Sequence, residues 1–440
     1  MDRRKFLSLA SLAGLAVAST DAFGRPGRPE TLGKNPTPLF ESYKGPFYIM
    51  VNAGGGWDPT SLCDPKGAAS AEDSEAMNRS YLTKDIGVTA SGIRYAPLGS
   101  MENPNYFRDF FEKHDKELLI LNGVDMATNG HDTGQVHTWS GRLANGYPSF
   151  AALAAAVHGR DLAMSYLSFG GYDDTQGLVA RTRSGNTQAL ARIAYPDRID
   201  PANEASLFHA PAASKAILDA QMARKDRLLA NEQLPRVQRA VGMMYASRTG
   251  SNELKKLQQY LPAMLDNSGN PLLRQIQVAM AAYKAGITVA VNLNIGGFDT
   301  HGNHDAAHIP QLQRVLEGLD FIGKEAERQG VPGNYVVMAG SDFGRTPGYN
   351  DTDGKDHWSI TSVIAMGKGI RGGRVIGETT ERHDLKSVDP KTLKVSDSGI
   401  HLEPKHIHQN LRRLAGIESD ELMGFYPLSI AADEDMNLFS

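Results

Sequence analysis

Short apolar runs that end in glycine or aspartate recur along the chain, and this pattern constrains the fold more than any other feature. The clearest example is GITVAVNLNIGGFDTH over residues 286–301, a β-branched apolar segment followed by two glycines and an acidic group. Continuous apolar runs bounded by glycine are typical of strands buried on both faces, as in largely parallel sheets. The pattern predicts strands within residues 47–51, 117–125, 163–171, 286–301, 334–346 and 362–369.

Helical patterns lie between several of these runs. Residues 309–329 place apolar side chains near helical spacing with charges on the other side, and residues 150–158 are also predicted to be helical. The span from about 203 to 285 is rich in Ala, Leu and Gln and poor in strand signals, so we expect a helical insertion there. Alternating strands and helices predict a three-layer α/β sandwich with a largely parallel central sheet, built as one domain over residues 25–440.

The first 24 residues are predicted to be an export signal and are excluded from the fold. Arg3 and Arg4 precede an uncharged stretch, residues 8–19, that is rich in Leu and Ala. It is shorter than the roughly 20 apolar residues that a membrane span needs. A basic start, a short apolar core and small residues describe a secretory signal, and the arginine pair indicates the twin-arginine route. The prediction is a periplasmic or secreted protein; the alternative is a soluble amphipathic helix.

Composition narrows the classes of partner. The chain has a single cysteine, Cys63, which excludes an internal disulfide. Its formal net charge of −4 argues against nucleic acid or an anionic membrane as the main partner. Mean hydropathy is −0.36, and no second apolar run approaches spanning length, so we expect no stable membrane span.

Acidic and histidine side chains gather after the predicted strands. Four acidic residues follow the ends of apolar runs: Asp58, Asp125, Asp299 and Asp342. A parallel sheet would bring such ends to one edge, where crowded carboxylates repel one another unless a cation neutralises them. Histidines in GGFDTHGNHDAAH (296–308) and DGKDHWS (353–359) favour zinc over ions that prefer oxygen-only ligands. The alternative interpretation of each single aspartate is a turn or helix cap.

The order of these motifs resembles the DUF1501 family. The stretch GGWD follows the first strand and FDTH a later one, and SDFGRT, DHW and GKGIRGGRVIG come after them in the family's order. The resemblance extends over nearly the whole mature chain. It implies an alkaline phosphatase-like fold, in a superfamily that includes sulfatases and cofactor-independent phosphoglycerate mutases, and export by the twin-arginine route.

The resemblance also implies a metal centre. The residues that match ligand positions are Asp58, Asp299, His301, Asp342 and His357, with His304 as an alternate ligand or as a residue that orients one. Zinc is the expected ion, with manganese or calcium as alternatives. Phe343 stands where the superfamily has a histidine, which leaves one metal position short of a ligand. Arg345 is the candidate for binding a sulfate or phosphate group through its planar guanidinium.

The nucleophile has no direct match. No serine or cysteine occupies its place in NGHDTGQVHTWSGRL (129–143), so Thr133 and His131 become the catalytic candidates, with Thr128 nearby. His131 is alternatively a metal ligand or an ordinary loop residue. The predicted function is metal-assisted hydrolysis of a phosphate or sulfate ester of a small molecule or glycan. The rival hypothesis is a non-catalytic metal-binding envelope protein that lacks the nucleophile.

Overall fold

The structure is a computed structural model. It describes residues 42–159, 162, 164–183, 194–195, 197–200, 203–234, 237–238, 241, 245 and 254–440. The predicted signal segment, residues 1–24, lies outside these residues. In the described part of the chain, no helix is long and apolar enough to cross a lipid bilayer.

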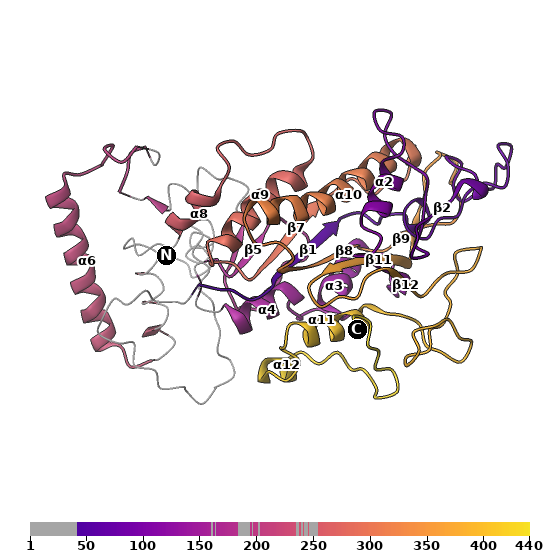
Figure 1. Cartoon of the computed structure of the whole chain (residues 1–440). Helices are drawn as coiled ribbons and strands as arrows, with labels where there is room; N and C mark the ends of the chain where they lie inside the picture. Colours follow the sequence, from indigo (N-terminus) through magenta and orange to yellow (C-terminus); the bar gives the residue numbers. More distant parts are fainter. Residues whose placement is uncertain are drawn as a thin grey trace.

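A mixed but mainly parallel sheet forms the centre of the molecule (Figure 1). Within the described residues it has eight strands in the order β12-β4-β11-β8-β1-β7-β5-β6. Their bounds are Arg374–Ile376 (β12), Leu119–Asp125 (β4), Ile360–Gly367 (β11), Tyr335–Ser341 (β8), Phe47–Ala53 (β1), Ala290–Ile295 (β7), Tyr166–Ser168 (β5) and Arg181–Arg183 (β6). β11 runs antiparallel to both of its neighbours, and the other pairs are parallel. The largely parallel sheet is therefore confirmed, with one strand reversed.

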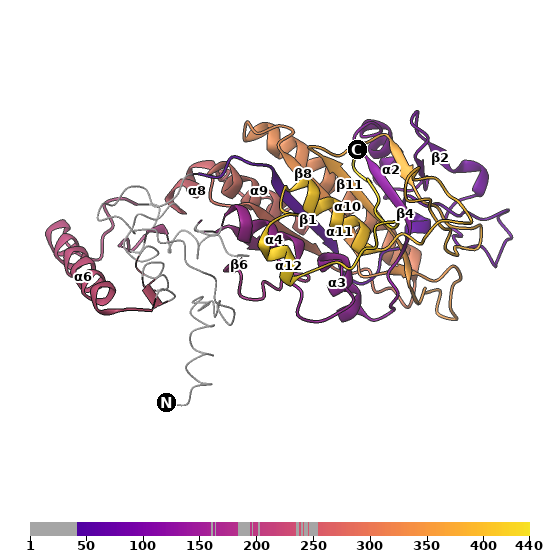
Figure 2. The same cartoon turned by 90° about the horizontal axis from the view of Figure 1, so that it is seen from below.

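Helices cover both faces of this sheet, as Figures 1 and 2 show from two directions. One layer contains α2 (Tyr106–Lys113), α8 (Leu254–Tyr260), α9 (Pro271–Lys284) and α10 (His304–Arg328). The other contains α3 (His131–Ser140), α4 (Phe150–His158), α11 (Pro404–Leu414) and α12 (Glu421–Phe425). In β1, Ile49 and Val51 face the first layer, whereas Tyr48 and Met50 face the second. Both faces of the strand are buried, which is why its sequence is continuously apolar.

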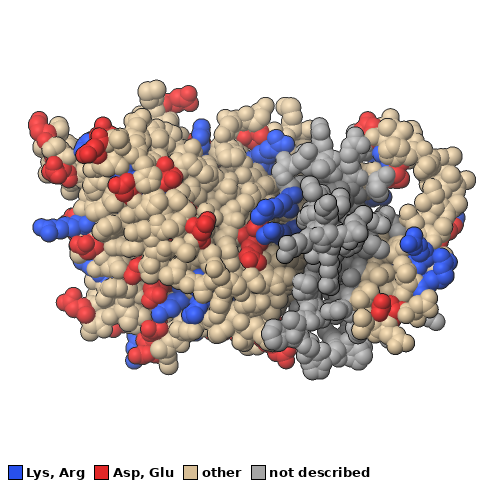
Figure 3. Space-filling view, turned by 180° about the vertical axis from the view of Figure 1, so that it is seen from behind, with Lys and Arg blue, Asp and Glu red and all other residues tan. Residues whose placement is uncertain are grey.

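The remaining elements lie outside this three-layer core or are short. The helix α6 (Pro211–Asn231) has no buried residue and stands away from the sheet in Figure 1. By contrast α9, from the same predicted insertion, packs against α10 and β7 and belongs to the core. The short elements are η1 (Pro59–Ser61), η2 (Thr83–Asp85), β2 (Gly87–Val88), β3 (Arg94–Tyr95), β9 (Gly344–Arg345) and β10 (His357–Trp358). On the face in Figure 3, the acidic and basic side chains of the described residues are interspersed.

One edge of the sheet gathers the chain segments that carry the predicted site. The last residue of β1, Ala53, pairs with Ser341 of β8 and with Ile295 of β7, so all three strands end at this edge. Because β11 is antiparallel, it starts here, and β10 precedes it. The helix α3 also begins at this edge, with His131 in contact with Asp342 just after β8.

Candidate metal centre

Three histidine rings converge on one carboxylate oxygen at this edge. The Nε2 atoms of the three rings lie 3.0 Å (His301), 3.2 Å (His357) and 3.5 Å (His131) from Oδ1 of Asp299. The Nε2 atoms of His301 and His357 are 3.0 Å apart. The ligand atoms of His131, Asp299 and His357 all lie within 4.8 Å of one another. The four side chains thus form one compact cluster.

Each ring is held through its other nitrogen. The Nδ1 partners are Oδ2 of Asp342 for His131 (2.8 Å), Oδ1 of Asp356 for His301 (2.7 Å) and the backbone carbonyl of Asn129 for His357 (2.7 Å). Carbonyl and carboxylate oxygens accept hydrogen bonds, so the hydrogen-bond pattern assigns the proton of each neutral ring to Nδ1. The lone pair on each Nε2 then points toward Asp299, which is the arrangement that fixes metal-binding histidines in proteins.

This donor set fits a divalent metal ion. Two Nε2 lone pairs 3.0 Å apart cannot hydrogen-bond to each other. The buried Nε2 of His131 also has no hydrogen-bond partner among the described residues. Ligands at about 2.0–2.1 Å from a tetrahedral zinc ion lie about 3.3 Å apart, close to the 3.0–3.5 Å found here. Imidazole and carboxylate ligands together suit zinc better than calcium, which prefers oxygen ligands.

The cluster opens to solvent. The exposed fractions of the side chains are 49% for Asp299, 47% for His301, 33% for His131 and 24% for His357. Structural zinc sites are closed by protein ligands, whereas catalytic sites keep a position that an outside molecule can reach. His131 is also the first residue of α3, whose N-cap Gly130 provides no side-chain cap. Free N–H groups at such a helix start favour an anion next to the centre.

Asp299 is held in its ionised form. Burial opposes ionisation, but the hydrogen bond from the Arg345 guanidinium and its positive charge lower the pKa of Asp299 to about 2. The hydrogen bond from His301 likewise lowers the pKa of Asp356. Burial raises the pKa of Asp342, against the opposing hydrogen bond from His131. Asp299 is therefore the carboxylate that brings a full negative charge to the cluster at neutral pH.

Arg345 lies behind Asp299 and does not face solvent. Its side chain is fully buried. Nε donates to the carbonyl of Gly56 (2.8 Å) and Nη1 to the carbonyl of Lys355 (2.9 Å). Nη2 donates to the carbonyl of Gly55 and to Oδ1 of Asp299 (2.8 Å). Each nitrogen of the guanidinium thus has a protein acceptor. The geometry makes Arg345 a support for Asp299, in place of the sulfate- or phosphate-binding role predicted from the sequence.

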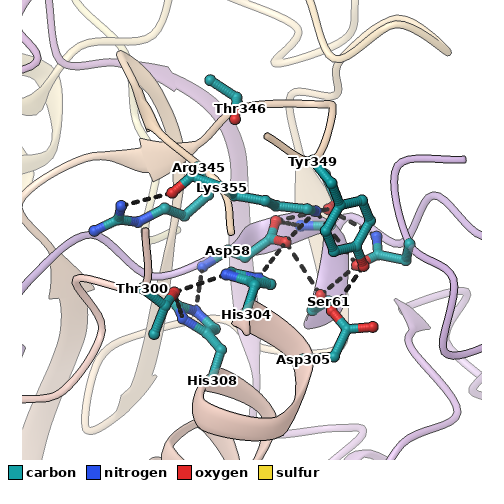
Figure 4. A network of polar contacts seen from close by, with 12 residues as sticks. Asp58, Ser61, Thr300, His304, Asp305, His308, Arg345, Thr346, Tyr349 and Lys355 are labelled. Carbon is teal, nitrogen blue, oxygen red and sulfur yellow. Dashed lines mark hydrogen bonds and ion pairs between the residues drawn. The ribbon is translucent and has the colours of Figure 1, made fainter. Parts of the chain in front are cut away.

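Asp58 and His304 lie in a separate, fully buried network (Figure 4). Oδ2 of Asp58 is 2.6 Å from Nζ of Lys355 and 3.2 Å from Nε2 of His304. Of the six predicted ligands, the structure brings Asp299, His301 and His357 together in the exposed cluster. Asp342 lies behind His131. Asp58 and His304 contact each other in the buried network, apart from the cluster. Lys355 was not predicted to be functional, although it lies in the same DGKDHWS motif as His357. Asn129 carried no signal, because it acts through its backbone carbonyl.

Comparison with protein families gives a match over most of the chain. The family described as "Protein of unknown function (DUF1501)" matches residues 47–426. The chain belongs to the DUF1501 family. No curated protein matches its sequence.

Solved structures similar to this DUF1501 protein include two sulfatases and an alkaline phosphatase. The alkaline phosphatase from the Antarctic bacterium TAB5 is 11% identical, with a TM-score of 0.36, over 85% of this chain and 99% of that one. The PsFucS1 sulfatase from Pseudoalteromonas sp. is 11% identical, with a TM-score of 0.34, over 85% and 68% of the two chains. BT1596, a 2-O GAG sulfatase, is 11% identical, with a TM-score of 0.30, over 89% and 72%. Such low scores do not assign an activity to this chain.

The remaining catalytic candidate of the DUF1501 chain is Thr133, in the first turn of α3. Its hydroxyl lies 2.7 Å from Oγ1 of Thr128 and donates to the carbonyl of Gly130 at 3.0 Å. Among the described residues, no serine or threonine hydroxyl hydrogen-bonds to the side chains of the four clustered residues. The candidate nucleophile Thr133 therefore lies in the helix turn that carries His131 but, among the described residues, makes no hydrogen bond to the clustered side chains.

Phe343 forms a wall beside the cluster. The ring is fully buried. Its centroid lies 4.8 Å from that of His131 and 4.5 Å from that of His357. Phe343 thus packs against two of the clustered rings and limits their rotation.

Proposed function

We propose that this DUF1501 protein is a metal-dependent hydrolase of phosphate or sulfate esters. The observation that carries the proposal is the convergence of three oriented Nε2 atoms on the ionised Asp299 at a solvent-exposed edge. Such a centre holds an ion and leaves room for a substrate oxygen. Export as a periplasmic or secreted protein is part of the same proposal.

The residues of the chain have separate tasks in this proposal. His131, His301, His357 and Asp299 would hold the ion, and the Nδ1 partners keep the rings aligned. A bound divalent ion would act as a Lewis acid toward the ester. The first turn of α3 presents free N–H groups to the negatively charged ester oxygens. Thr133, in the same turn, remains the candidate hydroxyl nucleophile.

A hollow beside α3 can take the organic part of a substrate. Its volume is about 330 Å³, and its lining includes Asp132, Gln135, Asp174 and Arg181. Asp132 directly follows His131 in α3, so the hollow and one of the clustered rings share the first turn of this helix. Carboxylate, amide and guanidinium groups bind hydroxyl-rich molecules through hydrogen bonds. This lining supports a small polar molecule or a glycan as the alcohol part of the ester.

The first test is hydrolysis of aryl phosphates and aryl sulfates by the purified protein. We expect slow turnover that a chelator reduces by at least about 100-fold, because a Lewis-acid ion contributes several kcal/mol to such reactions. Zinc or manganese should restore it. The measurement is product absorbance before chelation, after chelation and after each metal is added back. Activity unaffected by complete metal removal would contradict the proposal.

Replacement of Thr133 by alanine then identifies the nucleophile. The variant should keep its metal, because among the described residues the hydroxyl hydrogen-bonds only to Thr128 and to the Gly130 carbonyl. Loss of turnover with full metal content would assign the nucleophile to Thr133, and an unchanged rate would assign it to a water molecule.

The second candidate function is a non-catalytic metal-binding protein of the envelope. It is favoured by one observation, namely that the Thr133 hydroxyl is occupied by neighbours in its own turn. Under this hypothesis the fully metallated protein turns over none of a broad panel of phosphate and sulfate mono- and diesters, while metal binding is unchanged.

Export is tested with the arginine pair of the predicted signal. We expect Arg3→Lys/Arg4→Lys to retain the precursor in the cytoplasm, since the twin-arginine route requires both arginines. Cell fractionation and immunoblotting of the full-length chain give the result. Normal export of the double variant would rule out this route.

A further inference from the structure

A lysine ammonium lies in a buried cage of oxygen atoms beneath the exposed cluster. Nζ of Lys355 is 2.6 Å from Oδ2 of Asp58, 3.4 Å from Oγ1 of Thr60 and 3.4 Å from Oδ1 of Asn78 (Figure 4 shows the contact with Asp58). Lys355 and Asp58 are both fully buried. An ammonium has three N–H donors, and here each has an oxygen acceptor. The cage is therefore a cation site whose cation belongs to the protein itself.

The neighbouring histidines are neutral, and the position of each ring proton follows from one hydrogen bond to the next. The backbone N–H of Asp58 donates to Nε2 of His308 at 2.8 Å, so the proton of His308 is on Nδ1. That Nδ1 lies 3.0 Å from Oγ1 of Thr300, whose hydroxyl is then free to donate to Nδ1 of His304 at 2.7 Å. Nε2 of His304 consequently carries a proton and donates to Asp58. Burial lowers the pKa of both rings, which favours these neutral forms.

The cage is electrically balanced by a single ion pair. Burial alone would raise the pKa of Asp58, but the Lys355 ammonium and the hydrogen bond from His304 hold it well below its ordinary value. Asp58 also accepts hydrogen bonds from the backbone N–H and hydroxyl of Thr60 at 2.9 and 2.6 Å. One negative and one positive group thus meet among neutral partners. A metal ion added to this cage would bring uncompensated positive charge next to the ammonium.

The same lysine connects the cage to the exposed cluster. Its backbone N–H donates to the carbonyl of Thr300, which lies between Asp299 and His301. Its carbonyl accepts from Arg345, whose other nitrogen holds Asp299. His357 follows two residues later. The backbone of Lys355 therefore joins the buried cage to both segments that carry ligands of the exposed cluster.

We propose that the ammonium of Lys355 occupies a second cation site, formed by Asp58, Thr60, Asn78 and His304, and excludes a metal ion from it. The inference rests on the proposed function in one respect: it calls this site the second because the first metal ion is proposed to bind in the exposed cluster. Carboxylate, imidazole, amide and hydroxyl groups are themselves metal ligands. Removal of the ammonium leaves these groups around a cavity, and the buried Asp58 then needs another cation.

Cobalt titration of the metal-free full chain tests this inference, with binding followed by visible absorbance and by elemental analysis after desalting. We expect the wild type to bind one equivalent, Lys355→Met to bind a second, and Asp58→Asn/Lys355→Met to lose the second again. A folded Lys355→Met protein that binds no more cobalt than the wild type would overturn the inference. If the wild type binds no cobalt, the exposed centre is refuted. The buried site is still tested in that case, because Lys355→Met should bind one equivalent of cobalt more than the wild type.

A second variant covers the case in which Lys355→Met does not fold. Lys355→Ala removes the part of the side chain that n-propylammonium can replace, and 1-propanol is its neutral counterpart. We expect n-propylammonium to raise the denaturation midpoint of Lys355→Ala, with no such effect on the wild type, and 1-propanol to have no effect. Equal effects of the two compounds, or none from n-propylammonium, would show that the site requires no cation.

Discussion

Asp299→Ala is expected to abolish metal binding at the exposed cluster and ester hydrolysis with it. Oδ1 of Asp299 is the atom common to the contacts of all three histidines. In the unchanged protein this oxygen lies 2.8 Å from the guanidinium of Arg345. Removal of the carboxylate therefore leaves a positive guanidinium next to the ion without its counter-charge. Changes to residues that merely orient ligands lower metal affinity by about 10–100-fold. We therefore expect Asp299→Ala to lower it by more than about 100-fold.

The measurement is a competition titration with a zinc-sensitive dye, accompanied by thermal denaturation to verify folding. Asp356→Asn should have the smaller effect of about 10–100-fold, because Asp356 acts through Nδ1 of His301. Asp351→Ala, at an exposed carboxylate in the 350–353 turn, is the matched control and should bind metal normally. Equal metal affinity in Asp299→Ala and Asp351→Ala would mean that the cluster is not the metal centre.

Among the variants proposed here, Lys355→Met should lower the free energy of unfolding the most. It leaves the fully buried Asp58 without its counter-ion. Breaking one half of a buried ion pair typically costs about 3–5 kcal/mol, whereas replacing both halves by neutral groups of similar size is often nearly neutral. Asp58→Asn/Lys355→Met should therefore recover most of the free energy of unfolding. Urea denaturation of the metal-free proteins at neutral pH gives the comparison, and a double variant less stable than Lys355→Met would contradict it.

The contribution of the pair also depends on pH. The pKa of Asp58 is depressed in the folded state, so its ionised form stabilises the fold at pH values above the unfolded pKa of about 3.9. This contribution is lost as the pH falls through the lower pKa of the folded state. The free energy of unfolding of the wild type should therefore fall relative to that of Asp58→Asn/Lys355→Met in this acidic range. A relative stability that does not change with pH would exclude Asp58 as the source of the pH dependence.

Six of the eight strands of the central sheet, and three of the four clustered side chains, could be predicted from the sequence. Continuous apolar runs report burial on both faces, and residues 47–51 indeed lie in β1 at the centre of the sheet. Asp299, His301 and His357 follow or precede such strands directly, so their position at the sheet edge followed from the pattern. The direction of β11 could not be predicted, because burial gives the same pattern in a parallel and an antiparallel strand.

The division of the polar residues into two sites depended on tertiary structure. His301 and His304 are close in sequence, but Asn303 has a left-handed backbone (φ 48°) and α10 begins at His304, which turns that ring inward. The partners of the rings are also remote: His131 meets Asp342 across 211 positions, and Asp58 meets Lys355 across 297. Spacing along the chain indicates which groups reach one edge of a sheet. Which of them face solvent, and which cation each carboxylate meets, is decided by backbone turns and by burial, because desolvation favours ion pairing only where the fold excludes water.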